Sequence, residues 1–238
     1  FIKIKLGTVI MEVERNIKPK NNFLKKVRSL TKKNNIILIF DECTSAFRET
    51  YGGLHKKYKV NPDIAIFGKA LGNGYAINAV VGSKKVMMKA KDSFISSTFW
   101  TERIGPSAGI ATLNEMKRVK SWKYISKLGE YIKENWIIIA KKNNIKIRIT
   151  GLSSICSFNF YKNNQLLKTY VTQEFLKKKI LATNVIYVST KHNKKNLKIY
   201  FKNLDKIFKK IAFFQKQKKI NKSIINNDVA KIKFERLN

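Results

Sequence analysis

The chain of 238 residues is 44% hydrophobic, which is enough for a substantial core spread over one or two domains. Its longest apolar runs fall far short of the roughly 20 residues that a membrane-spanning helix needs, so we predict no membrane span. Two cysteines and two histidines without ligand-like spacing argue against a disulfide scaffold and a metal site, and they indicate a reducing, cytoplasmic compartment.

The strongest compositional signal is charge, because 50 basic and 15 acidic residues leave a net charge of +35. Such an excess is typical of proteins that bind nucleic acid. Lys, however, is spread along the whole chain, and only seven residues are Arg, the side chain that makes bidentate contacts. We therefore interpret the lysines as solvated surface charge and do not expect a nucleic-acid partner. A basic nucleic-acid-binding module stays as the alternative from a different functional class.

The first predicted elements are a strand at residues 8–12 and an amphipathic helix at 22–33. A second strand is predicted at 36–40, where the run IILIF has the continuous apolar, β-branched character of a strand buried in a parallel sheet. This run ends abruptly in DECTSAFRETYGG, so Asp41 lies at the C-terminal end of a strand. Open α/β sheets bind their ligands at that edge.

Residues 63–67 form the next predicted strand, which ends in GKALGNG and therefore places Lys69 at another strand end. A strand at 76–82 and a short helix at 83–90 follow, and the pattern from 106 to 142 is predominantly helical. Strands that alternate with helices predict an α/β fold.

Beyond residue 142 the pattern predicts a small α+β domain. Its expected elements are strands at 145–149, 155–160 and 185–189, and helices at 172–179 and 194–214. We divide the chain into an α/β domain at 1–118, the small α+β domain at 119–214, and a basic tail at 215–238 that we expect to be frayed.

Asp41 and Lys69 are the two residues whose types and positions point to a specific chemistry. An enzyme that uses pyridoxal phosphate needs an amine to hold the cofactor's aldehyde and a carboxylate to keep the pyridine nitrogen protonated. Each residue follows a short apolar strand, so both are placed to reach the same sheet edge. Position alone favours a turn cap for the Asp and a solvated surface charge for the Lys, so the surrounding sequence has to decide.

Three stretches resemble the class III, pyridoxal-phosphate-dependent aminotransferases: LIFDECTSAFR, GGLHKKYKVNPDIAIFGKALGNGYAINAVVGSK and SSTFWTERIGPSAGIATL. The spacing is similar as well, with 28 positions from Asp41 to Lys69 and 29 from Lys69 to Thr98. GLSSICSFNF and the stretch from TQEFLKKKI to KNLDKIF resemble the small domain of the same family. The resemblance covers most of the chain and is closest to the branch that includes glutamate-1-semialdehyde aminomutase.

The resemblance implies the type I fold of these enzymes. Residues 1–118 would be the C-terminal half of the cofactor-binding large domain, and 119–214 the small domain. The family's N-terminal arm, first strands, glycine-containing phosphate loop and ring-stacking aromatic residue should precede Phe1, so the chain looks N-terminally incomplete. The resemblance also implies pyridoxal 5'-phosphate as the cofactor and a homodimer with composite sites.

The implied activity is amino-group transfer, through a Schiff base on Lys69, between a small-molecule amino donor and an aldehyde or keto acceptor. An aminomutase, which moves the amino group within one molecule, is the alternative, and no residue of the chain decides between the two. An inactive fragment is a further alternative, because the missing N-terminal segments make up much of the cofactor cradle.

The resemblance also assigns roles residue by residue. Lys69 is implied to form the internal aldimine and then to shuttle the proton, and Asp41 to bind the pyridinium nitrogen. Cys43 stands where the family usually has Val against the ring face. Thr44 stands where many relatives have Gln near the ring hydroxyl, which puts that hydrogen bond in question. Thr98 matches the Thr that reaches the cofactor phosphate of the neighbouring subunit.

Overall fold

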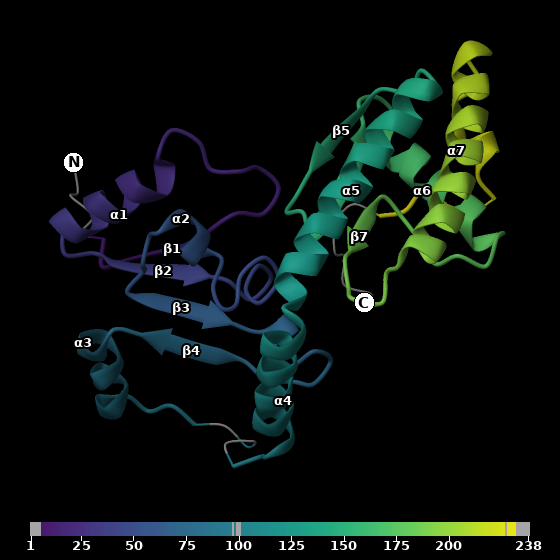
Figure 1. The fold of residues 1–238 in the computed structure, drawn as a ribbon. Coiled ribbons are helices and arrows are strands. Elements are labelled where there is room, and N and C mark those ends of the chain that lie inside the picture. The colour runs from purple at the N-terminus through teal and green to yellow at the C-terminus, as the bar shows by residue number, and fades with distance from the viewer. Residues whose placement is uncertain (1–5, 97, 99–100, 227, 232–238) are drawn as a thin grey trace, which may run out of the picture. The chain divides into compact units, whose positions relative to one another are not determined.

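The computed structural model describes residues 6–96, 98, 101–226 and 228–231 (Figure 1). The chain forms two compact units, Phe1–Ser126 and Lys127–Asn238. Among the helices in these described ranges, none is both long and apolar enough to cross a membrane.

The first unit is built on a four-stranded sheet in the order β1-β2-β3-β4. The first three strands are parallel and β4 is antiparallel to β3. Leu38 and Phe40, in the second strand, are fully buried, as the apolar run predicted. Because parallel strands end at the same edge, the C-terminal ends of β2 and β3 lie side by side. The strands are β1 (Thr8–Glu12), β2 (Ile37–Asp41), β3 (Ile64–Phe67) and β4 (Ala79–Gly82).

Helix α1 (Phe23–Lys33) connects β1 to β2 and packs against β2 (Figure 1). The Arg28 guanidinium donates two hydrogen bonds to the Asp63 carboxylate, at 2.5 and 2.9 Å. Asp63 also accepts a bond of 2.9 Å from the backbone N–H of Leu38. One carboxylate at the start of β3 therefore ties the helix to two neighbouring strands.

The remaining helices of this unit are shorter or more broken than the sequence pattern predicted. The helix expected at 83–90 is a single α-turn followed by a 3-10 turn. The long helical stretch is interrupted at Lys120, whose φ of 50° is left-handed and cannot continue an α-helix. The elements are α2 (His55–Tyr58), η1 (Lys69–Leu71), α3 (Lys84–Met87), η2 (Met88–Asp92), α4 (Ile104–Val119) and α5 (Ser121–Lys142), of which α5 continues into the second unit.

The second unit has an antiparallel sheet in the order β5-β6-β7, with helices around an aromatic core. The Trp136 ring meets Phe158 at 5.0 Å, and Phe158 meets Phe208 at 5.6 Å, both edge to face. The Trp136 indole donates a 2.9 Å hydrogen bond to the Tyr200 hydroxyl, so its buried N–H is satisfied. The elements are β5 (Ile147–Thr150), β6 (Ile155–Phe160), α6 (Asn164–Leu176), β7 (Val185–Tyr187), α7 (Lys194–Lys216) and η3 (Lys222–Ile224).

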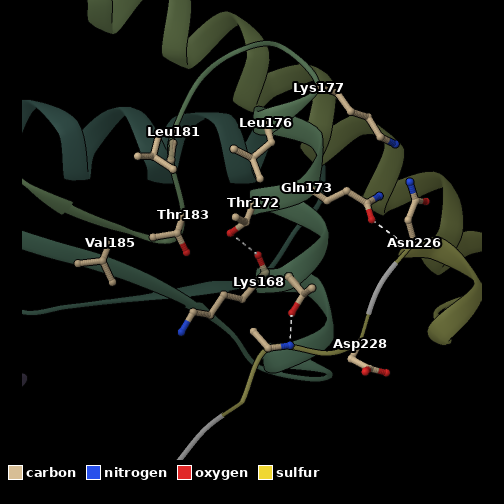
Figure 2. A pocket seen from close by; sticks show the side chains of 13 residues that line it. Lys168, Thr172, Gln173, Leu176, Lys177, Leu181, Thr183, Val185, Asn226 and Asp228 are labelled. Atoms are coloured by element: carbon tan, nitrogen blue, oxygen red, sulfur yellow. Dashed lines mark hydrogen bonds between the residues drawn. The ribbon is translucent and has the colours of Figure 1, made fainter. Parts of the chain in front are cut away.

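Helix α6 begins eight residues before the predicted start at 172, and it binds the C-terminal segment that we expected to be frayed. Thr169 Oγ1 accepts a hydrogen bond from Ala230 N at 3.0 Å, and Gln173 Oε1 accepts one from Asn226 N at 2.6 Å (Figure 2). Together with Leu181, Ala182, Thr183 and Val185, the helix and the segment line a pocket of about 630 Å³ (Figure 2). Side chains spaced four residues apart on α6 thus hold the backbone of the tail.

Gly129, on α5, packs closely against the backbone of Ser153. A Cβ atom added there would lie 1.7 Å from the carbonyl oxygen of Ser153. Gly129→Ala improves helix propensity by about 1 kcal/mol, but the clash is with rigid backbone, so we expect a net loss of roughly 1 to 3 kcal/mol in the free energy of unfolding. Urea denaturation would measure it.

The matched control is Gly109→Ala on α4, where the added Cβ would lie at an ordinary 3.4 Å from Ile77 Cδ1. We expect that variant to keep the stability of the parent chain or exceed it. A Gly129→Ala protein as stable as Gly109→Ala would contradict the close approach.

Candidate active site

The chain turns sharply away from the sheet after β2. Asp41 is the last residue of the strand, and Glu42 N still donates to Ile66 O at 2.9 Å. The Asp41 carboxylate then accepts a 3.1 Å hydrogen bond from Cys43 N, and Ala46 N donates to Glu42 O at 3.0 Å. The small polar residues after the apolar run therefore form a tight turn, which places their side chains at the C-terminal edge of the sheet.

Glu42, fully buried, closes this loop from the inside. Its Oε1 lies 2.5 Å from His55 Nδ1, and its Oε2 accepts hydrogen bonds from Ser45 Oγ at 3.3 Å and from the backbone N–H of Leu54. The carboxylate thus joins the start of the 42–55 loop to its end. Sequence reasoning missed this pair: the only available signal was the second carboxylate next to Asp41, and His55 was weighed only as a metal ligand.

Lys69 follows β3 at the neighbouring strand end and is the first residue of η1. Its φ is 41°, in the left-handed region that non-glycine residues rarely occupy. Gly68 before it is buried, and a Cβ there would lie 2.3 Å from Asn78 Oδ1, so a larger residue would require the Asn78 side chain to move. The Lys69 ammonium donates a 2.6 Å hydrogen bond to Thr44 Oγ1. Its side chain therefore bridges from the end of β3 to the loop after β2.

Two charged side chains, Asp41 and Lys69, act on the thiol of Cys43. Burial raises the pKa of its thiol above the ordinary value, the negative charge and hydrogen bond of Asp41 raise it further, and the positive charge of Lys69 lowers it. Both charges therefore act on one sulfur atom. The thiol stays protonated at neutral pH and behaves as a small, weakly polar side chain.

The structure brings four of the five predicted site residues together: Asp41, Cys43, Thr44 and Lys69. The fifth, Thr98, is an exposed turn residue next to positions outside the described ranges, and its predicted role concerns a neighbouring subunit. Within the described residues, no cluster of three or more His, Cys, Asp or Glu side chains has the arrangement of a metal site. The roles of the five residues toward a cofactor stay predictions.

The chemistry of these side chains fits the ring end of pyridoxal phosphate. A carboxylate, a lysine amine, a hydroxyl and a small thiol lie along one edge of a parallel sheet, where ligands of α/β folds bind. A pyridinium nitrogen requires the carboxylate and an aldehyde requires the amine. For the phosphate end, the sequence offers Thr98, whose hydroxyl is a suitable donor.

The environment of Cys43 leads to a testable prediction. We expect iodoacetamide to modify it slowly at neutral pH, at a rate that increases above the ordinary thiol pKa, because only the thiolate reacts. Asp41→Asn removes the like charge, lowers the pKa and shifts the reaction to lower pH. Cys156 competes little, because burial raises its pKa to about 12. Mass spectrometry over a pH series measures both rates, and a Cys43 as reactive at neutral pH as free cysteine would contradict the geometry.

Solved structures of transaminases share this fold. An omega-transaminase from Sphaerobacter thermophilus superposes with a TM-score of 0.77 at 19% identity, over 87% of this chain and 52% of that one. A structure described as the PLP internal aldimine form of the Sphingopyxis sp. MTA144 FumI protein superposes with a TM-score of 0.80 at 18% identity, over 89% and 53%. The predicted type I fold is confirmed.

The family model described as aminotransferase class-III matches residues 16–204, and the chain belongs to this family. Glutamate-1-semialdehyde 2,1-aminomutase from Methanosphaera stadtmanae is 32% identical over 181 residues, which are 73% of this chain and 43% of that protein. 3-aminobutyryl-CoA aminotransferase from Cloacimonas acidaminovorans is 32% identical over 158 residues, covering 66% and 38%. The chain thus spans less than half the length of these two relatives.

Proposed function

We propose that this protein is a pyridoxal-phosphate-dependent aminotransferase that moves an amino group between a small amino donor and an aldehyde or keto acceptor. The observation that carries the proposal is the Lys69 amine, bound at 2.6 Å to Thr44 at the sheet edge where Asp41 and Cys43 lie. When bound, pyridoxal phosphate supplies a ring that accepts the electron pair left when an amino compound loses its Cα proton.

In this proposal Lys69 has two tasks. Its amine would hold the cofactor at the aldehyde carbon, and as a free base it would accept the proton from the donor's Cα. Lys69 is suited to both tasks because its side chain spans the gap between two strand ends and is exposed toward the edge where a ligand would bind.

Asp41 would keep the proton on the ring nitrogen of the cofactor and would not transfer a proton itself. Its carboxylate would accept a hydrogen bond from the ring N–H and keep that nitrogen positively charged. One of its oxygens already binds Cys43 N at 3.1 Å, which fixes the orientation of the carboxylate. Cys43 would pack against the ring and Thr44 would lie beside Lys69.

The proposal includes a homodimer. Thr98 would donate to the cofactor phosphate of the neighbouring subunit, so each site would need two chains.

We also place the protein in the cytoplasm, in keeping with its two unpaired cysteines.

The second candidate function is intramolecular amino transfer, because several relatives carry the name glutamate-1-semialdehyde 2,1-aminomutase. The two reactions differ in their need for a second substrate. An aminomutase converts one compound into its isomer, whereas an aminotransferase releases a keto product from the donor and requires a separate acceptor.

The test is to supply the protein with pyridoxal phosphate and single amino donors and to measure keto-acid release together with conversion of the cofactor to its amine form. We expect release in proportion to cofactor in the absence of an acceptor, and continuous turnover once one is added. Isomerisation of an amino aldehyde without any acceptor would favour the aminomutase. A protein that converts no donor and no amino aldehyde would contradict both.

A further inference from the structure

We propose that Thr44 is a positioning residue that holds the Lys69 amine ready to attack the cofactor aldehyde. This inference rests on the proposed function and deepens it, because it assigns to Thr44 a task toward the protein's own lysine rather than toward the ring hydroxyl. Three independent features of the site support it.

The first feature is the contact itself. Lys69 Nζ and Thr44 Oγ1 are 2.6 Å apart, a short hydrogen bond for an ammonium donor. A hydroxyl both donates and accepts, so Thr44 can bind the ammonium through its oxygen and the neutral amine through its hydrogen. The contact therefore survives the proton loss that the amine needs before it adds to the aldehyde carbon, whose oxygen would leave as water.

The second feature is that Thr44 is itself held firmly. Arg48 Nε donates to the backbone carbonyl of Thr44 at 2.7 Å, and Phe47 N donates to Gly52 O at 2.8 Å across the loop. Glu42, fully buried, closes the same loop through His55. Because the backbone around Thr44 is fixed on both sides, its hydroxyl is a stationary partner rather than a mobile surface group.

The third feature is the backbone of Lys69. Other lysines with positive φ, such as Lys59 and Lys120, end an α-helix, a position where the left-handed conformation is common. Lys69, with a φ of 41°, instead begins a 3-10 turn. Such conformations are strained and persist where surrounding contacts determine them. At Lys69 the strained backbone directs the side chain toward the loop after β2, where the amine binds Thr44 Oγ1.

The consequence is kinetic. Lys69 is exposed, and a free lysine side chain loses rotamer entropy when its amine must occupy one place. Holding the amine beforehand removes part of that cost from the attachment step. Thr44 should therefore speed covalent attachment more than it tightens the prior, reversible binding of the cofactor.

The experiment compares Thr44→Val, which keeps the shape and removes the hydroxyl, with Thr44→Ser, which keeps the hydroxyl. Each protein is mixed with pyridoxal phosphate, samples are reduced with borohydride at a series of times, and peptide mapping gives the rate of label at Lys69. We expect attachment to be about tenfold slower in Thr44→Val and close to the parent rate in Thr44→Ser. The label on other lysines and the melting temperature should stay unchanged.

Thr50→Val is the structural control, because Thr50 Oγ1 binds Gly52 O and Gly53 O in the same loop without touching Lys69. If it slows labelling as much as Thr44→Val does, loop integrity is responsible and the inference is wrong. Equal rates in the parent and Thr44→Val also overturn it, while the proposed function stands. If the parent chain carries no label at Lys69, the proposed function fails and the inference falls with it.

Discussion

Replacing Lys69 with Ala should abolish specific covalent binding of pyridoxal phosphate and reduce amino transfer by several orders of magnitude. The reason is geometric: Lys69 is the lysine whose amine reaches from the end of β3 to Thr44, beside Asp41 and Cys43. An amine delivered from elsewhere would lack both the position and the neighbouring carboxylate. Borohydride reduction followed by peptide mapping locates the label, and keto-acid release gives the activity.

Lys84→Ala provides the matched control for this experiment. Lys84 begins α3 on the exposed surface and is one of the many lysines of the chain, so its removal should leave label and activity unchanged. A pyridoxyl group found chiefly on any lysine other than Lys69 would overturn the assignment.

The second large effect is expected from Asp41→Asn, which preserves the shape of the side chain and removes its charge. The label at Lys69 should persist, because the amine is untouched. Removal of the Cα proton should slow by roughly 100-fold to 1,000-fold, because the ring nitrogen loses the carboxylate that keeps it positively charged. Exchange of the donor's Cα hydrogen with solvent deuterium, followed by NMR, measures this step directly.

Asp92→Asn serves as the control for charge alone, because Asp92 lies at the exposed end of η2 and pairs only loosely with Lys89, at 3.8 Å. It should exchange the Cα hydrogen at the parent rate. If Asp41→Asn exchanges equally fast, Asp41 does not serve the ring nitrogen and its role is limited to holding the turn through Cys43 N.

Much of the first unit could be predicted from local sequence. The run at 36–40 became β2, in which Leu38 and Phe40 are fully buried on one face while Ile37 and Ile39 on the other face are partly buried. Helix α6 has a weak hydrophobic periodicity, and its start was wrongly predicted at residue 172 instead of 164. Its buried residues follow helical spacing, but Glu174 on the buried face is charged and Leu176 is apolar yet exposed, so the hydrophobic periodicity is blurred.

The resemblance to the family named Asp41, Cys43, Thr44 and Lys69 as candidate site residues, and the structure places these four residues together. The side-chain contacts within the site could not be predicted from the sequence. The Lys69–Thr44 bond joins residues 25 positions apart, and the Glu42–His55 pair joins residues 13 apart. Neither leaves a periodic trace in the sequence, because hydrogen bonds between loops depend on how strands align rather than on neighbouring residue types.

Local sequence was enough to predict which residues end strands, because an apolar run stops where a polar turn begins. That the ends of β2 and β3 are neighbours follows from the folded sheet, through the parallel pairing of Asp41 with Ile66. Strand pairing is set by the packing of the whole sheet, so the same two motifs on strands that were not neighbours would carry the same residues without a shared site. It is this pairing that brings a carboxylate, a thiol, a hydroxyl and an amine to one edge.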